Sequence, residues 1–436
     1  MDFFGIAGCR TAYGLVIGNF ADSKSFPFFF LSFMDSIMRM IGRQEVWEDF
    51  LAYRLRKGRL TWTTFQEADD FVGDQAFEDV ARKFASGEAP GIPFRTEINK
   101  MGSGKKRVVY QFNPDEMSVL KLISYLLYRY DDRFSPGCYS FRRGVRASDA
   151  IFSIRRELRG RQMWAYKVDI HNYFNSISIP ILMPILKDLL RDDPELYAFL
   201  ERLLSDDRSL SGETLIRENR GVMAGVPTAP FLADVYLMEV DRHFFEEGVV
   251  YARYSDDIIL FAPDYEELLR RKAELLDYFG KYRLEVNPDK EHVYSPDEPF
   301  EFLGFRCLGN KIDISSSTLE KMKGRIRRKT RSLRRWVSKK GKDPVLAMKA
   351  LVRSFNNKFF ESDGSGSLSW SRWFFPVVNQ TEGMAEIDHY LQDNIRYLYS
   401  GHHNKAVYRV RYTDLKALGY RSLVGEYYKW RETTSE

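Results

Sequence analysis

The chain is poor in the residues that build disulfide frameworks and zinc sites. Its 436 residues include only three cysteines, Cys9, Cys138 and Cys307, which lie far apart and form no CxxC pair. Its six histidines show no metal-site spacing with these cysteines. These absences argue against a disulfide scaffold and a zinc ribbon, and they favour a reducing, cytoplasmic location.

Long apolar runs are also absent. The one hydrophobic block, residues 25–34, is far below the ~20 residues that a helix needs to span a bilayer. It has neither the basic start nor the small-residue cleavage site of a signal peptide. We therefore expect a buried helix or strand there, and no association with a membrane.

Acidic residues are missing from one segment. The net charge is only +5, but residues 321–342 contain twelve Lys or Arg and no acid. Met322, Ile326, Leu333 and Val337 recur there at roughly helical spacing, so one face of the predicted helix is apolar and the rest is cationic. With no Glu at i,i+4, self-repulsion indicates a polyanionic partner whose affinity falls with salt. A solvated helix face is the alternative interpretation.

Two further segments interleave arginine with aromatic residues. They are RWFFPV, at residues 372–377, and the run at residues 395–412. Such side chains stack on RNA in nucleic-acid-binding proteins. Burial of the same aromatics in a helical core is equally expected.

The length predicts two to four lobes, and an apolar fraction of 44% allows a sizeable core. Residues 42–89 carry aromatics and charge at helical spacing. We expect one helix face there to be shared by Trp47, Phe50, Leu51, Tyr53 and Leu55.

Two adjacent aspartates, Asp256 and Asp257, lie between apolar β-type runs in YARYSDDIILFA. The runs predict a hairpin with the pair at its tip, where solvated side chains are the commonest outcome. A third acid, Asp169, ends a predicted strand in WAYKVDIHNYFNSI. The order of elements between them fits an antiparallel split βαβ sheet with helices on one face, in which the three carboxylates converge. Oxygen ligands on a rigid sheet suit a pair of Mg²⁺ ions.

These segments, in this order and spacing, resemble a prokaryotic reverse transcriptase related to group II intron and retron enzymes, across residues 91–310. YSDD at 254–257 resembles the YxDD box of the family. The resemblance implies an α+β, right-hand polymerase. Its parts would be an N-terminal helical extension (1–90), fingers (91–165), a ferredoxin-like palm (166–310) with a helical insertion at about 180–217, and a basic helical thumb and C-terminal region (311–436).

The resemblance also implies a role for each matched residue. Two Mg²⁺ ions, with Mn²⁺ as the alternative, would be held by Asp169, the carbonyl of Ile170, Asp256 and Asp257. Lys290, in VNPDKEHV, would act in catalysis near the leaving pyrophosphate. The incoming nucleotide would meet Lys105, Arg107, the aromatic gate Phe174, Gly225 and Pro227. The primer grip would be Leu303 and Gly304, in FEFLGF. Nucleic acid would contact Arg142, Arg143, Arg325, Arg327, Arg328, Arg331, Arg334 and Arg335.

The loop before the long palm helix departs from the family pattern. The family has GxPQGxPxSPxLAN, and this chain has GVMAGVPTAPFLAD. Ala224 replaces a glutamine that contacts the incoming nucleotide, Ala229 replaces a serine and Asp234 replaces an asparagine. The glycine and prolines remain, so we expect the backbone path to be kept and the nucleotide grip or template use to differ.

Among its relatives, the chain most resembles the free-standing unknown-group and abortive-infection enzymes, the defence-associated reverse transcriptases. It has no HNH-like endonuclease segment and no retron VTG signature, and it is short for a maturase. The resemblance implies a structured noncoding RNA as partner and template, a DNA primer, dNTPs, a cDNA product and an anti-phage role. A homo-oligomer is left open. The alternatives are template-independent or protein-primed synthesis, and a maturase-like RNA-binding protein.

Overall fold

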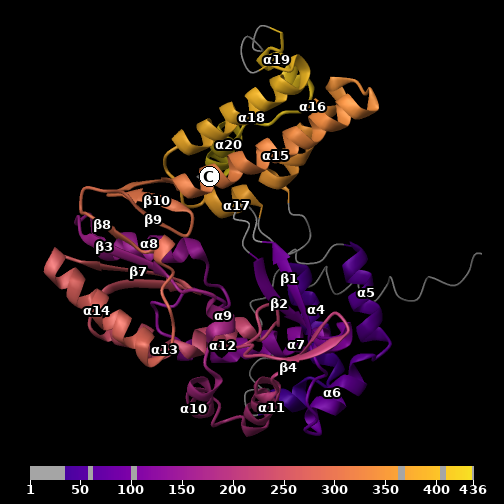
Figure 1. The fold of residues 1–436 in the computed structure, drawn as a ribbon, viewed down its shortest axis with the longest axis vertical. Coiled ribbons are helices and arrows are strands. Elements are labelled where there is room, and N and C mark those ends of the chain that lie inside the picture. Colours follow the sequence, from indigo (N-terminus) through magenta and orange to yellow (C-terminus); the bar gives the residue numbers. More distant parts are fainter. Residues whose placement is uncertain (1–34, 57–61, 100–105, 362–368, 403–408, 435–436) are drawn as a thin grey trace, which may run out of the picture. The chain divides into compact units, whose positions relative to one another are not determined.

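The computed structural model describes residues 35–56, 62–99, 106–361, 369–402 and 409–434 (Figure 1). The chain divides into two compact units, Met1–Ser36 and Ile37–Glu436, and every helix and strand named below belongs to the second. The hydrophobic block at 25–34 and the predicted nucleotide contact Lys105 lie outside the described residues. Across the described ranges, no helix is both long and apolar enough to cross a membrane.

Short helices open the second unit. They are α3 (Ile37–Met40), α4 (Gln44–Arg56), α5 (Trp62–Gly73) and α6 (Phe77–Ala85). Trp47 stacks on Phe77 with ring centroids 4.9 Å apart. The predicted apolar face of α4 is buried except at Leu55, which is 42% exposed in the last turn of the helix.

A four-stranded sheet follows, with strand order β2-β1-β4-β5. Its strands are β1 (Phe94–Asn99), β2 (Lys106–Gln111), β4 (Arg208–Ser211) and β5 (Thr214–Arg217). The predicted insertion is helical only in α10 (Ile179–Leu189) and α11 (Pro194–Ser205). Our expectation of helix up to residue 217 is wrong, because β4 and β5 form a hairpin whose first strand pairs with β1.

The second sheet, with order β6-β7-β3-β8, is antiparallel throughout. Its strands are β3 (Trp164–Asp169), β6 (Val250–Tyr254), β7 (Asp257–Ala262) and β8 (His292–Tyr294). Alternate residues of β7 enter two cores: Ile258 and Leu260 join one, and Ile259 and Phe261 join the other. Both faces are therefore covered, which explains the unbroken apolar run after Asp257.

Helices lie along both faces of this sheet rather than one. The contacts to the sheet are made by α8 (Ala147–Leu158), α13 (Met238–Glu246) and α14 (Tyr265–Lys281). The remaining elements before the third sheet are α7 (Pro114–Leu126), η1 (Leu127–Arg133), α9 (Tyr173–Ser176), α12 (Ala229–Tyr236) and η2 (Pro288–Lys290). The predicted α+β palm architecture is confirmed.

A small sheet, β9 (Phe300–Phe302), β10 (Phe305–Leu308) and β11 (Lys311–Ile314), leads into the C-terminal helices. These are α15 (Ser316–Lys340), α16 (Pro344–Phe360), α17 (Trp370–Phe374), α18 (Glu382–Ser400), α19 (Tyr412–Ala417) and α20 (Leu423–Thr434). The hydroxyl of Ser315 caps α15 by accepting from the Thr318 amide at 3.2 Å.

The predicted apolar face of α15 is packed in the core, with Met322, Ile326 and Val337 buried and Leu333 partly buried. The aromatics at 372–377 were expected either to stack on RNA or to be buried. Burial is the outcome for Phe374 and Phe375.

Candidate active site

Three carboxylates meet where β3 ends and the β6–β7 hairpin turns. Asp169, the last residue of β3, lies opposite Asp257, the first residue of β7. The amide of Ile170 donates to the carbonyl of Asp256 at 3.1 Å. Strand pairing thus brings together acids that are far apart in the sequence, and it places the three acidic members of the predicted metal site at one end of the paired strands.

A two-residue turn presents the aspartate pair. Tyr254 pairs with Asp257, which leaves Ser255 and Asp256 as the turn. Ser255 has φ 60°, a left-handed value that non-glycine residues seldom adopt. A positive φ at the first turn residue alone is typical of a type II′ hairpin, whose twist matches that of the strands. The backbone strain at Ser255 therefore lies immediately beside the acids.

Burial and mutual repulsion raise the pKa of two of these carboxyl groups. For Asp256 the largest cause is burial, followed by the charge of Asp169. For Asp257 burial is again the largest cause, and Lys167 opposes it with an ammonium 3.4 Å away. The Lys290 ammonium contacts the carboxylate of Asp169. Three acids therefore face two lysines, and the site keeps an excess of negative charge.

The donor set fits a hard divalent cation in its chemistry. Carboxylate oxygens held on a sheet are ligands that Mg²⁺ and Mn²⁺ accept, and a cation would relieve the repulsion that raises the pKa of Asp256 and Asp257. In the described part of the chain, no three His, Cys, Asp or Glu side chains are arranged as a metal site. Since Lys290 contacts Asp169, a cation bound there would compete with this ammonium.

The loop at 221–227 is held between β2 and α9 by hydrogen bonds. The amide of Ala224 donates to Oδ1 of Asn175 at 3.0 Å, and its carbonyl accepts from the amide of Tyr110 at 2.8 Å. Nδ2 of Asn175 donates in turn to the carbonyl of Val108 at 3.2 Å. The predicted nucleotide contact Gly225 follows as an exposed residue. Ala224 therefore lacks the glutamine side chain of the family, but both polar groups of its backbone have partners.

Aromatic rings gather beside this loop. The ring of Phe174, the predicted gate, lies 6.2 Å from that of Phe141, which lies 6.4 Å from that of Tyr254. Phe141 is 38% exposed and has φ 50°. Sequence reasoning missed Phe141, although it stands beside the predicted arginines in CYSFRRG.

Those two arginines are engaged within the protein. Nη1 of Arg142 donates to the carbonyls of Ser135 and Cys138, at 3.1 and 2.9 Å. The guanidinium of Arg143 lies over the ring of Tyr53, 5.5 Å from its centroid. Both groups therefore stabilise the local fold, and the contact with nucleic acid that the resemblance implies remains a prediction.

The other predicted contacts are distributed over the fingers and the small sheet. Arg107 is exposed on β2 and Pro227 is half-buried. Leu303 and Gly304 form the turn between β9 and β10, where Leu303 has φ 51°. The predicted primer grip is therefore a tight hairpin turn.

The cationic face of α15 is partly used in packing. Arg327, Arg328, Arg331 and Arg335 are exposed, whereas Arg325 and Arg334 are half-buried. Nη1 of Arg334 donates to the carbonyl of Leu398 at 3.1 Å.

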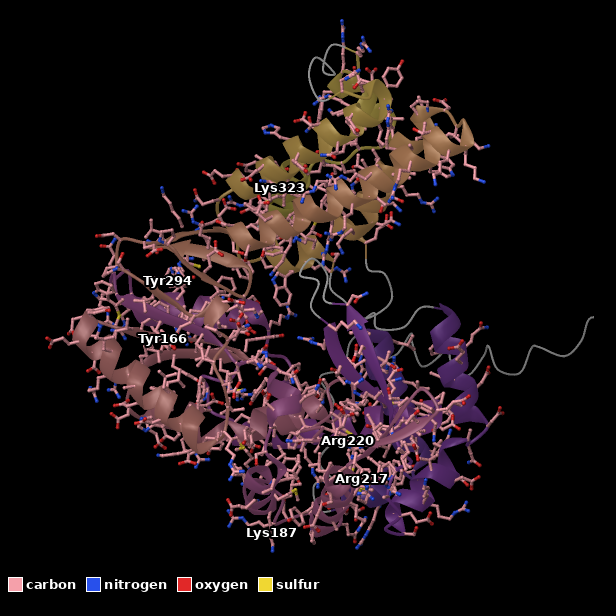
Figure 2. All side chains as sticks on the ribbon, in the orientation of Figure 1. Tyr166, Lys187, Arg217, Arg220, Tyr294 and Lys323 are labelled. Atoms are coloured by element: carbon pink, nitrogen blue, oxygen red, sulfur yellow. The ribbon has the colours of Figure 1, made fainter. Side chains whose placement is uncertain are left out.

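One lysine of α15 is neutralised by acids that lie outside the acid-free segment. Lys323, labelled in Figure 2, contacts Glu320 at 3.0 Å and Glu386 at 2.5 Å. Glu320 lies one residue before the acid-free segment, and Glu386 belongs to α18. The exposed positive charge of α15 therefore lies on the four exposed arginines and on four exposed lysines, Lys321, Lys329, Lys339 and Lys340.

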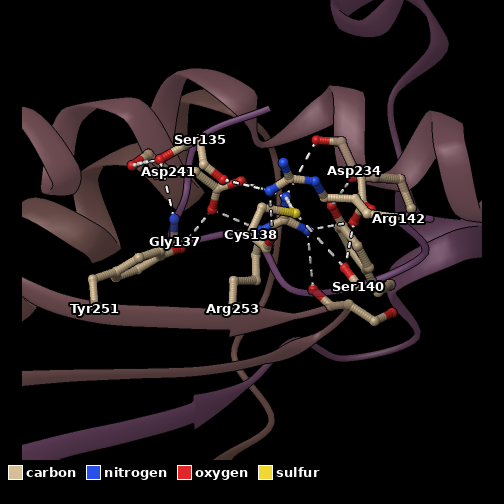
Figure 3. A network of polar contacts seen from close by, with 12 residues as sticks. Ser135, Gly137, Cys138, Ser140, Arg142, Asp234, Asp241, Tyr251 and Arg253 are labelled. Carbon is tan, nitrogen blue, oxygen red and sulfur yellow. Dashed lines mark hydrogen bonds and ion pairs between the residues drawn. The ribbon is translucent and has the colours of Figure 1, made fainter. Parts of the chain in front are cut away.

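A buried arginine ties the β6–β7 hairpin to the helices (Figure 3). Arg253 is fully buried on β6, and its Nε donates to Asp241 at 2.8 Å. Its Nη1 donates to Asp234 at 3.1 Å and to the carbonyl of Ser255 at 3.3 Å. The hydroxyl of Ser140 donates to Asp234 at 2.6 Å. Burial raises the pKa of Asp234 to about 7. Sequence reasoning missed this network, although an arginine within an apolar strand implies a buried acid.

A family of known proteins matches the part of the chain that carries these three acids. Residues 98–307 match the family described as "Reverse transcriptase (RNA-dependent DNA polymerase)". This match indicates an RNA-directed DNA polymerase domain, the enzyme class that the sequence predicts.

Solved structures of telomerase are also similar to the chain. Apo telomerase from Candida tropicalis has a TM-score of 0.46 and 13% identity over 79% of this chain and 64% of that chain. Telomerase from Candida albicans in complex with a TWJ fragment of telomeric RNA has a TM-score of 0.44 and 12% identity over 80% and 68%. For the Candida tropicalis enzyme truncated from its C-terminal domain, the values are 0.41 and 13% over 51% and 55%. The chain thus spans between about half and two thirds of these relatives.

Proposed function

We propose that this chain is an RNA-directed DNA polymerase that copies an RNA template into DNA at the site formed by Asp169, Asp256 and Asp257. The observation that carries the proposal is the register of β3 and β7, in which Asp169 lies opposite Asp257 at the hairpin tip. The reverse transcriptase match over residues 98–307 supports it.

The acids would hold two divalent ions, Mg²⁺ or alternatively Mn²⁺, together with the Ile170 carbonyl. Such ions, when bound, activate the primer hydroxyl and neutralise charge on the triphosphate. All three carboxylates would serve as ligands, and Lys167 partly offsets the negative charge of Asp257. Lys290 contacts Asp169 in the present structure. A metal held by that carboxylate would compete with this ammonium, which would then be available to the pyrophosphate.

Two groups orient the nucleotide. Phe174 is fixed at its carbonyl by the amide of Val222 at 2.9 Å and at its ring by Phe141, so a rigid aromatic surface would oppose a ribose 2′-hydroxyl. Arg107, exposed on β2, would approach the triphosphate. Because Ala224 offers no amide side chain, the nucleotide is gripped with fewer polar contacts than in the family.

We propose further that the partner and template is a structured noncoding RNA, that synthesis takes place in the cytoplasm and that it serves anti-phage defence. The resemblance to the free-standing defence-associated enzymes supports this role. The exposed arginines of α15, at 327, 328, 331 and 335, suit the phosphates of an A-form duplex, which is gripped by shape and charge rather than by sequence.

The test is DNA synthesis by the purified chain with its co-purifying RNA, dNTPs and Mg²⁺. The double variant Asp256→Ala, Asp257→Ala should lose synthesis. A matched control is Asp206→Ala, Asp207→Ala, another adjacent pair, whose carboxylates contact Arg208 and Arg217 instead. Synthesis that persists in the first variant would overturn the proposal, and product formed without template would favour the template-independent alternative that Ala224 suggests.

A further inference from the structure

Helix α8 presents a cationic face away from the core. Phe152, Arg155 and Arg156 are exposed at i, i+3 and i+4, which places them on one side of the helix. Arg159, also exposed, is the residue that follows the helix as its C-cap, with φ 50°. The opposite side is buried, through Ala147, Ala150, Ile151 and Ile154. Within the described residues, none of the three arginines forms an ion pair with an acid.

This face borders a hollow in the surface. The hollow has a volume of about 400 Å³ and is lined by Phe152, Arg155, Arg156, Arg159, Gly160 and Asn310. Asn310 lies in the turn between β10 and β11. The walls therefore come from two elements distant in the sequence, and no acidic side chain is among them.

Helix stability alone does not account for this arrangement. Cations near a helix C-terminus are stabilised by the macrodipole, but like charges at i,i+4 oppose one another. Phe152, in the middle of α8, is 41% exposed and gains nothing from the dipole. Nη2 of Arg156 donates to the hydroxyl of Ser153 at 3.2 Å, but in the described part of the chain no acid neutralises the three guanidinium groups. An aromatic ring beside such groups is the combination that stacks on a base and neutralises phosphates.

We propose that this α8 hollow is a second RNA-binding site, in which the arginines contact the phosphate backbone and Phe152 stacks on an unpaired base. The choice of RNA as the ligand rests on the proposed function. The Leu303–Gly304 turn precedes strand β10, and Asn310 follows it. At 3.3 Å per residue, an extended chain from Gly304 to Asn310 spans about 20 Å. RNA in the hollow therefore leaves the predicted primer grip free and serves to anchor the partner RNA.

The test measures binding to the full chain by fluorescence anisotropy, with a labelled 30-nucleotide RNA hairpin carrying a single-stranded tail, over a range of salt concentrations without Mg²⁺. The triple variant Arg155→Gln, Arg156→Gln, Arg159→Gln should bind about 10- to 50-fold more weakly at 0.15 M salt. Its slope of log K against log salt should fall by about two, because each lost phosphate contact removes about 0.7–0.9.

The matched control removes the same charge elsewhere. Arg191, Arg217 and Arg270 each contact a carboxylate, so their triple change to Gln should alter affinity less than about threefold. Phe152→Ser, which keeps every charge, should weaken binding to the tailed RNA and leave the salt slope unchanged. Equal losses in the α8 triple variant and the control, or equal losses for RNA and for DNA of the same sequence, would overturn the RNA site.

The site and the proposed function can fail separately. Extension of a short pre-annealed primer on its template, without the structured RNA, should be unchanged in the α8 triple variant. If the wild type never makes DNA but the α8 variant still loses RNA affinity, the polymerase proposal fails and the RNA site stands. If the wild type makes DNA and the α8 changes leave affinity and slope unchanged, the site fails and the polymerase stands.

Discussion

Replacing Asp234 with asparagine removes one negative charge from the buried network around Arg253 and keeps its shape. The carboxylate accepts from Ser140 at 2.6 Å and from Arg253 at 3.1 Å, and an amide oxygen in the same place can accept both bonds. Asp241 keeps its own bonds to the guanidinium, so Arg253 stays paired. We therefore expect Asp234→Asn to fold and to keep the turn at Ser255.

The proton on Asp234 sets the size of the effect. Burial raises its pKa from 3.8 to about 7, and each unit is worth about 1.4 kcal/mol. The folded protein thus binds this proton more tightly than the unfolded chain, so wild-type stability falls as pH rises from about 4 to about 7. Asparagine does not titrate. The advantage of the variant should therefore grow by up to about 3 kcal/mol between pH 5 and pH 8.5.

Urea unfolding followed by tryptophan fluorescence at pH 5, 6.5 and 8.5 measures this difference. A chain of this length need not unfold in one step. The quantity to compare is therefore the difference in unfolding free energy between the variant and the wild type at each pH. Asp132→Asn, at a carboxylate that is 79% exposed, is the control and should leave the pH profile unchanged. A difference that stays constant with pH, or a variant less stable than the wild type at pH 8.5, would refute the reasoning.

Three other changes test the site from different sides. Arg253→Met should cost about 3–5 kcal/mol of stability, because it leaves buried carboxylates unpaired; an unchanged urea midpoint would contradict this. Gly221→Ala should abolish nucleotide binding or folding, because a Cβ there would lie 2.3 Å from the carbonyl oxygen of Phe174. Gly309→Ala, at a similar φ but in open space, should cost only the backbone strain of that φ and lower the melting temperature less; equal effects on melting temperature would argue against the difference. Lys290→Met removes the ammonium at the end of β3, so added Mg²⁺ should raise the melting temperature of this variant more than that of the wild type, and an equal rise would refute the competition.

The gathering of the three acids could be predicted because it depends on local patterns. Apolar runs on either side of Asp256 and Asp257 specify a hairpin, and a third run ending at Asp169 specifies its neighbour. Antiparallel pairing then leaves little freedom in where the carboxylates lie. The buried face of α15 was predictable for a similar reason, since helical spacing alone identifies it.

The partners of charged side chains could not be predicted in this way. Arg334 and Arg331 look alike in a basic run, yet the first bonds to the carbonyl of Leu398 and the second is exposed. Which arginine meets a carbonyl depends on helix packing that no local pattern records. The pairing of β4 with β1 was missed for the same reason, because one strand contact joins residues more than a hundred positions apart.

The anchoring of Ala224 has a consequence for protein engineering. Its amide and carbonyl are both engaged, so the position of its backbone does not depend on what the side chain does. A graft of glutamine at 224 would then add a chemical group without redirecting the chain that carries it. Any gain in selectivity among the four bases would then be due to the added side chain alone. Residue 224 is therefore a suitable position at which to compare this protein with enzymes that have glutamine there.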